Sequence, residues 1–92
     1  MDYKITFKNS VSKDLKRIDI KKASEILDKI ETELTIDAEK YPVLKSKFSG
    51  LRKYRVGDYR VIYSIINEST VLILRIKHRK EVRTRRTKFE LK

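Results

Sequence analysis

The stretch LRKYRVGDYRVIY, residues 51–63, carries four cations and one anion at a spacing that suits phosphate binding. Gly57 and Asp58 form a pair of the kind found in type II′ hairpin turns, in which glycine supplies a positive φ. Counting outward from this turn sets Arg55 directly opposite Arg60, and such a like-charge pair destabilises a sheet. A bound phosphate would relieve the repulsion, because guanidinium groups hold phosphate oxygens through paired hydrogen bonds. The alternative is that both side chains splay into solvent at a cost of about 0.5 kcal/mol.

Alternation of apolar and basic residues predicts two strands at this hairpin and a third strand in residues 70–79. The apolar face is expected to hold Tyr54, Val56, Tyr59, Val61, Tyr63, Ile65, Leu72, Leu74 and Ile76. A second turn at Glu68 and Ser69 sets Ile66 opposite Val71, Tyr63 opposite Leu74 and Arg60 opposite Lys77. The other face is expected to hold Lys53, Arg55, Arg60, Arg75, Lys77 and Arg79. Six cations on one open face favour a bound polyanion over separate solvation of each charge.

One short strand and two helices are predicted ahead of this basic sheet. Residues 3–7 alternate as a strand, and residues 9–38 carry apolar side chains at helical spacing. Candidate caps for the first helix are Asn9, Ser10 and Ser12. Asp19 is expected to cap the second helix. The apolar stripe of that helix would comprise Ile20, Ala23, Ile26, Leu27, Ile30 and Leu34.

These elements predict an α+β fold, with an N-terminal strand and then two helices packed on one face of an antiparallel sheet that has three consecutive C-terminal strands. The 92 residues are expected to form one domain, 1–92, with a basic C-terminal segment at about 79–92. That segment has 7 basic and 2 acidic residues. It is either a flexible charged arm or a short helix that binds RNA.

The net charge of the chain lies in its second half. Residues 1–42 carry nine charges of each sign, whereas residues 43–92 carry 15 Lys and Arg against 4 Asp and Glu. Phosphates are bound through pairing with Lys and Arg and through release of counterions, so a nucleic acid is the favoured partner. The alternatives are a solvated basic face and an acidic protein partner.

Several classes of protein are excluded by composition. The chain has no cysteine, which rules out a disulfide framework and a thiolate metal site. One histidine and scattered carboxylates form no recognisable set of metal ligands, so no cofactor is expected. No apolar run is long enough for a signal peptide or a membrane span, and a cytoplasmic protein is expected.

The segments LRKYRVGDYRVIYSI and VLILRIKHRKEV resemble the RelE/ParE superfamily of toxins from bacterial and archaeal toxin–antitoxin pairs. The similarity extends over most of the chain and depends on the GDYRVIY hairpin together with the HRKEV ending. For a RelE-like member, the resemblance implies an endoribonuclease that cuts mRNA in the ribosomal A site and so inhibits translation. It also implies mRNA, the ribosome with its rRNA, and a cognate RelB-like antitoxin as partners.

The resemblance further assigns catalytic positions. The basic pair before the turn, the arginine of the second strand and the arginine near the end of the last strand fall on Lys53, Arg55, Arg60 and Arg79. The chain departs from the family pattern at Arg83, where members commonly have a tyrosine that helps to stack or orient the nucleotide. Phe89 is a candidate to replace that ring.

Cleavage by attack of a 2′-hydroxyl requires removal of its proton, stabilisation of a phosphorane and a proton for the leaving oxygen. Charge stabilisation is available from Arg55, Arg60 and Arg79. Lys53 is a candidate base if neighbouring cations favour its neutral form, and Glu81 is the carboxylate nearest the end of the basic strand. Each also has a simpler interpretation, Lys53 as a phosphate anchor and Glu81 as the ion-pair partner of a neighbouring cation.

Further nucleic-acid contacts are expected from Arg52, Arg75, Lys77, His78, Arg83, Arg85 and Arg86. His78 falls on the apolar face of its strand, so a packed or capping histidine is favoured over a catalytic one. An antitoxin contact could include Ile62, Ile66, Val71 and Ile73, which the counted register places on the open face, unless the connection at 41–50 covers them.

Two other functions fit the same resemblance. One is a ParE-like inhibitor of DNA gyrase, which acts by binding a protein and has no need of a phosphate site. The other is an RNA-binding module or decayed toxin without catalysis. The set of cations on one face favours the ribonuclease, and the arginine at position 83 weakens that preference.

Overall fold

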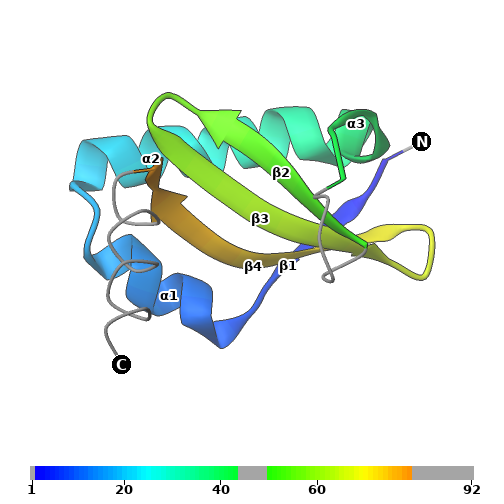
Figure 1. Cartoon of the computed structure of the whole chain (residues 1–92), viewed down its shortest axis with the longest axis horizontal. Helices are drawn as coiled ribbons and strands as arrows, with labels where there is room; N and C mark the ends of the chain where they lie inside the picture. Colours follow the sequence, from blue (N-terminus) through cyan, green and yellow to red (C-terminus); the bar gives the residue numbers. More distant parts are fainter. Residues whose placement is uncertain (1, 44–49, 80–92) are drawn as a thin grey trace, which may run out of the picture.

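The computed structural model describes residues 2–43 and 50–79, which form a four-stranded sheet and its helices (Figure 1). In chain order the labelled elements are β1 (Lys4–Phe7), α1 (Asn9–Lys16), α2 (Ile20–Lys29), α3 (Thr35–Asp37), β2 (Leu51–Val56), β3 (Tyr59–Ile66) and β4 (Thr70–His78). The strand order is β1-β4-β3-β2, in which β1 is parallel to β4 and the other neighbours are antiparallel. The α+β layout with three consecutive C-terminal strands is confirmed, and the parallel β1 makes the sheet a mixed one.

The second helix continues past α2 through a wider turn. Ile30–Leu34 form a π-helical turn, α3 follows, and a 3-10 turn at Ala38–Lys40 ends the segment. Its buried residues are Ile26, Ile30, Leu34 and Ala38, each four positions after the last. In a regular α-helix this spacing drifts by about 40° at each step, and the π-turn offsets the drift. Ile20, which was expected in the same stripe, lies in the first turn and is 84% exposed.

The helix starts are only partly as predicted. Asp19 caps α2, because its carboxylate accepts a hydrogen bond from the Lys21 backbone N–H at 3.2 Å. The first helix begins at Asn9, and no side chain caps it. Ser10 instead donates its hydroxyl to the Leu74 carbonyl on β4 at 2.7 Å. This serine therefore ties α1 to the edge of the sheet.

The first hairpin has the predicted register. Its pairs include Arg52 with Tyr63, Lys53 with Ile62, Tyr54 with Val61, Arg55 with Arg60 and Val56 with Tyr59. Gly57 has a φ of +59°, which glycine adopts without steric cost. The outward count from the turn was therefore correct for β2 and β3.

The second hairpin departs from the predicted register near its loop. The observed pairs include Ile66 with Thr70, Tyr63 with Ile73, Ile62 with Arg75 and Arg60 with Lys77. The loop thus has three residues, 67–69, where two were expected. The pairing then skips Leu74, a β-bulge that restores the predicted register for the end of β4.

This local shift changes which side chains of β4 are buried. Val71 and Ile73 are fully buried, although the sequence count placed them on the open face. Leu72 and Leu74, which were expected in the core, are only half-buried. A shift of one residue moves a side chain to the opposite face of a strand. Beyond the bulge, Ile76 lies in the core as predicted.

The core lies between the long helical segment and the sheet. Tyr63 has no exposed surface, and its hydroxyl donates a hydrogen bond to the Ala38 carbonyl at the end of that segment. Burial raises the pKa of Tyr63 well above its ordinary value. Among the described residues, α2 crosses behind the sheet, α1 lies beside β4, and the face toward the viewer in Figure 1 carries no helix. No helix in this part of the chain is long and apolar enough to cross a membrane.

Candidate functional site

A row of three cations crosses the open face of the sheet. Arg55 on β2, Arg60 on β3 and Lys77 on β4 are direct neighbours in the strand pairing. Neighbouring strands are about 4.8 Å apart, so three positive charges lie side by side. Lys53 and Arg75 lie two residues farther along β2 and β4, on either side of Ile62 on β3. We call Arg55, Arg60 and Lys77 the basic row, and the row together with Lys53 and Arg75 the basic face.

Three of these cations have no acidic partner in the described part of the chain. Lys53, Arg55 and Arg60 form no ion pair there, and Arg60 Nε is buried without a hydrogen bond. A buried donor without an acceptor is costly. An anion at the row could pair with the exposed Arg55 and with the outer nitrogens of Arg60, and it would reduce the repulsion between the two side chains.

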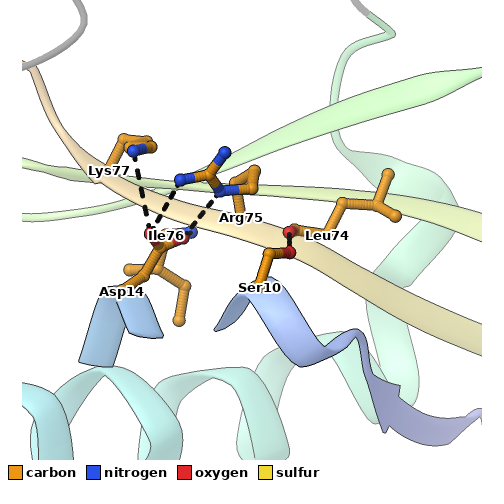
Figure 2. A network of polar contacts seen from close by, with 6 residues as sticks. All are labelled: Ser10, Asp14, Leu74, Arg75, Ile76 and Lys77. Carbon is orange, nitrogen blue, oxygen red and sulfur yellow. Dashed lines mark hydrogen bonds and ion pairs between the residues drawn. The ribbon is translucent and has the colours of Figure 1, made fainter. Parts of the chain in front are cut away.

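The two cations that β4 contributes to the basic face contact Asp14 on α1 (Figure 2). Arg75 donates from Nε to Asp14 Oδ2 and from Nη2 to Asp14 Oδ1, each at 2.9 Å. The Ile76 backbone N–H donates to Oδ2 at 2.9 Å, and Lys77 Nζ lies 3.7 Å from Oδ1. Burial alone would raise the pKa of Asp14, but the hydrogen bonds from Arg75 and Ile76 and the charges of Arg75 and Lys77 outweigh it and lower the pKa below its ordinary value. Asp14 is therefore ionised at neutral pH although only 4% of its side chain is exposed.

Arg79 lies just beyond β4, beside the first hairpin turn. Its backbone N–H donates to the Asp58 carbonyl at 2.9 Å, and its Nε lies 3.9 Å from Asp58 Oδ1. The side chains are 57% and 66% exposed, so this ion pair contributes little in water. The guanidinium group of Arg79 is accessible at the end of the sheet.

Arg52 and His78, two expected nucleic-acid contacts, lie away from the basic face. Arg52 Nη1 donates to the carbonyls of Glu39 at 3.2 Å and Tyr41 at 2.7 Å, where the helical segment ends. His78 pairs with Tyr59 on the face that packs against the helices, and the two rings meet edge-on with centroids 5.0 Å apart. Both placements favour a structural role, and that of His78 agrees with the packed histidine favoured from the sequence.

The remaining predicted residues lie outside the described part of the chain. These are Glu81, Arg83, Arg85, Arg86 and Phe89. Of the apolar residues considered for an antitoxin contact, Ile66 is 39% exposed and Ile62 is half-buried on the basic face. Within residues 2–43 and 50–79, no group of three or more His, Asp or Glu side chains is placed to hold a metal ion.

The sequence reasoning did not single out Asp14, although a signal was present. Val11, Asp14, Leu15 and Ile18 follow the spacing of one helix face. An acidic residue inside an apolar stripe is buried only when it is paired. The partner of Asp14 is therefore expected to be a cation on the element against which α1 packs. β4 supplies such cations, Arg75 and Lys77.

Comparisons with known proteins agree with the geometry. Residues 5–83 match the family described as "ParE toxin of type II toxin-antitoxin system, parDE". The RelBE2 toxin–antitoxin complex from Mycobacterium tuberculosis matches at 25% identity with a TM-score of 0.77, over 85% of this chain and 99% of that chain. The archaeal RelE–RelB complex from Pyrococcus horikoshii OT3 matches at 32% identity with a TM-score of 0.58, over 86% of this chain and 97% of that chain.

A more distant solved structure has the same fold. The chromosomal ParDE system from P. aeruginosa matches at 17% identity with a TM-score of 0.67, over 83% of this chain and 95% of that chain. No curated protein sequence matches the chain. The family match covers most of the sequence, and the order of strand, helices and three final strands is shared with the solved relatives. The chain therefore belongs to the ParE toxin family, within the RelE/ParE superfamily, and is a toxin of a type II toxin–antitoxin system.

Proposed function

We propose that this toxin is a ribosome-dependent endoribonuclease that cleaves mRNA in the ribosomal A site. The observation that carries the proposal is the basic face, on which Lys53, Arg55 and Arg60 have no acidic partner among the described residues. Surface cations that lack an acidic partner within the fold are available to pair with the phosphates of an RNA backbone. The two relatives above with at least 25% identity are both RelE–RelB type complexes, which favours a RelE-like activity.

The chemistry proposed is attack of a ribose 2′-oxygen on the adjacent phosphorus. The 2′-hydroxyl loses its proton and the 2′-O–P bond forms, while the bond from phosphorus to the 5′-oxygen of the next nucleotide breaks. The leaving 5′-oxygen takes a proton from solvent water, so that a cyclic phosphate and a 5′-hydroxyl result. Arg55 and Arg60 hold the non-bridging oxygens and stabilise the charge that grows on them in the phosphorane. Arg79, accessible at the end of the sheet, is proposed to contact the same phosphate or its neighbour.

Lys53 is the proposed acceptor of the 2′-hydroxyl proton. Arginine keeps its proton at physiological pH, so on the basic face only the two lysines have a neutral form that can accept one. Lys77 is 8% exposed and lies against Asp14, whereas Lys53 stands on β2, at the outer edge of the described sheet. Glu81, the other candidate named from the sequence, lies outside the described residues.

The proposed protein partner is a RelB-like antitoxin. The solved relatives from M. tuberculosis and P. horikoshii are complexes of a toxin with its antitoxin. An acidic antitoxin segment would be attracted to a chain with a net charge of +11.

Inhibition of DNA gyrase is the second candidate function. The specific observation in its favour is the family match, because that family is described as the ParE toxin of parDE systems. A gyrase inhibitor acts by binding a protein and does not need Arg60 for phosphate chemistry. The effect of substitutions on the basic face therefore separates the two candidates.

The test is primer extension on an mRNA translated by purified ribosomes in the presence of the toxin. We expect cuts at fixed codon positions with the wild-type chain, and a loss of about 10²–10³-fold in cleavage rate for Arg60→Ala, since one stabilising donor to a charged transition state has that effect. Arg79→Ala is expected to reduce cleavage as well. The matched control is Lys29→Ala, which removes one positive charge from the exposed side of α2 and is expected to leave cleavage unchanged.

A gyrase supercoiling assay with the same proteins completes the experiment. Intact mRNA together with stalled gyrase–DNA complexes would contradict the ribonuclease and favour the ParE-like function. Cleavage that is equal in the wild type and in Arg60→Ala would contradict the assignment of the basic row as the catalytic site.

A further inference from the structure

The C-terminal end of β4 lies next to α1, because β1 does not extend that far along the strand. The parallel pairing of β1 with β4 stops where Phe7 meets Ile73. Beyond that point, the Ser10 hydroxyl donates to the Leu74 carbonyl at 2.7 Å, and the Ile76 N–H donates to Asp14 Oδ2 at 2.9 Å. Two side chains of α1 therefore bind the backbone of β4 on both sides of Arg75 (Figure 2).

The β-bulge at Leu74 lies at these two hydrogen bonds. It determines on which face of the sheet the side chains of the last residues of β4 lie. Before Leu74, Val71 and Ile73 point into the core, and after it Ile76 does so. Without the extra residue, the alternation of the strand would turn Arg75 and Lys77 toward the core. The bulged register is thus the one that places both cations on the basic face.

Asp14 also compensates the charge of Lys77. The Lys77 side chain is 8% exposed and lies next to Arg60 in the basic row. A cation with so little water around it is stable only beside an opposite charge. The Asp14 carboxylate lies 3.7 Å from Lys77 Nζ and forms two hydrogen bonds with Arg75.

We propose that Asp14 is a positioning residue for the phosphate site, which from α1 holds β4 in its bulged register and keeps Lys77 beside Arg60. This inference rests on the proposed function, because it concerns the same basic face. Asp14 does not touch the phosphate in this arrangement. It acts through Lys77 and Arg75, which it holds on the open side of the sheet.

The inference makes a prediction opposite to that of general electrostatics. Asp14→Asn removes a negative charge from a chain with a net charge of +11, and charge alone would make any polyanion bind more tightly. If Asp14 positions the row, the same substitution weakens binding because Lys77 and Arg75 lose their anchor. The sign of the change therefore tells the two effects apart.

The experiment measures binding of a short single-stranded RNA by fluorescence anisotropy at several salt concentrations. We expect Asp14→Asn to weaken binding about three- to tenfold and to lower the salt slope by about 0.7, as for the loss of one phosphate contact with a single strand. Asp28→Asn is the matched control, since it makes the same change of charge at an exposed position on α2. Its affinity is expected to equal or slightly exceed that of the wild type.

A double-variant comparison checks that Asp14 acts through Lys77. In a Lys77→Met background, the further change Asp14→Asn is expected to cause a clearly smaller loss of RNA affinity than it does alone. A general loosening of the fold would instead cause the same loss in both backgrounds. Circular dichroism at the assay temperature selects the variants that are folded.

A measurement on the wild-type chain applies even if Asp14→Asn does not fold. In an NMR titration with the same RNA, the Arg60 Nε and Lys77 Nζ signals are expected to shift with a common midpoint, while the Ile76 amide stays protected from exchange. A Lys77 signal that does not move while Arg60 saturates would overturn the inference.

The outcomes separate this inference from the proposed function. A wild-type chain that does not bind RNA, or that binds it no better than Arg60→Ala does, contradicts the proposed function itself. Wild-type binding that Arg60→Ala abolishes, together with a folded Asp14→Asn that binds as tightly as Asp28→Asn, contradicts the role of Asp14 alone.

Discussion

Lys53 differs from Arg55 and Arg60 in one chemical respect, which is that it can exist without its charge. A lysine side chain can lose its proton and then accept another, whereas a guanidinium group stays protonated. Arginines can therefore bind and stabilise a phosphate but cannot remove a proton from the 2′-hydroxyl. The different roles proposed above for Lys53 and for the two arginines depend on this difference.

Lys53→Arg tests that division because it keeps the charge and removes the neutral form. We expect RNA affinity to stay within about twofold of the wild type, and ribosome-dependent cleavage to fall by about 10²-fold or more, as for loss of a general base. Binding is measured by anisotropy and cleavage by primer extension. The matched control is Lys29→Arg, which makes the same change at an exposed position on α2 and is expected to leave cleavage unchanged. Cleavage by Lys53→Arg at the wild-type rate would show that another group takes the proton.

The sequence was most informative about the side chains of the first hairpin. Arg55 and Arg60 could be placed opposite one another because a two-residue turn leaves only one way to count outward. Asp14 was missed for a physical reason, since its partners come from β4, about sixty positions away in the chain. The contact exists only once α1 lies along that strand.

Among the secondary-structure elements, β4 was predicted least accurately. Its loop has three residues, of which Asn67 and Glu68 have φ values of +43° and +70°. Because neither residue is a glycine, the sequence contained no glycine to indicate that this loop has a third residue. The compensating bulge at Leu74 is a tertiary feature, flanked by hydrogen bonds from α1, and the sequence of β4 alone does not specify it. The error was therefore confined to the half of the strand between the loop and the bulge.

The contact of α1 with β4 predicts how stability depends on pH. The pKa of Asp14 is lowered in the folded chain, so its ionised form stabilises the fold above the pKa of the unfolded state. This contribution is complete at neutral pH, begins to fall as the pH drops toward about 4, and is lost below the lowered folded-state pKa. We expect Asp14→Asn to reduce the free energy of unfolding by about 3 kcal/mol at pH 7.

Urea unfolding of the wild type and of Asp14→Asn between pH 7 and pH 3 measures this contribution. Arg17, Tyr59 and His78 line the hollow next to Asp14, but they are present in both proteins, so the difference between the two curves isolates Asp14. That difference is expected to shrink as the pH falls below about 4. A difference that is constant over the whole range would contradict an ionised Asp14 as the stabilising group.

The positive charge of the molecule is distributed unevenly between the two halves of the chain. The first 42 residues, which supply β1 and the helical layer, carry equal numbers of both signs, and the remaining residues carry the entire excess. Clustered cations repel one another in the free protein. This repulsion is reduced when RNA or an acidic antitoxin segment covers the basic face, so binding of either partner is expected to stabilise the fold.

If RNA binds to the basic face as proposed, the salt dependence of its affinity reports how many of these cations contact phosphate. Three of them, Lys53, Arg55 and Arg60, have no acidic partner in the described chain. With about 0.7 per contact for a single strand, these three cations and Lys77 together predict a slope near −3 for the logarithm of affinity against the logarithm of salt concentration. Arg55→Ala is expected to reduce the slope by about 0.7, and Lys29→Ala to leave it unchanged. A slope that is the same in both variants would mean that the basic row is not where RNA binds.

The hydroxyl of Tyr63 donates a hydrogen bond to the Ala38 carbonyl, so the protonation of this ring depends on the packing of the helical segment against the sheet. The chain has five tyrosines and no tryptophan. Because Tyr63 is fully buried and its pKa is raised, its ring stays protonated in alkaline solution for as long as the helical layer remains on the sheet. Tyr54 lies in the same core and burial raises its pKa to about 12, so the phenolate absorbance gained by these two rings would record separation of the two layers, whether heat, denaturant or a partner protein causes it.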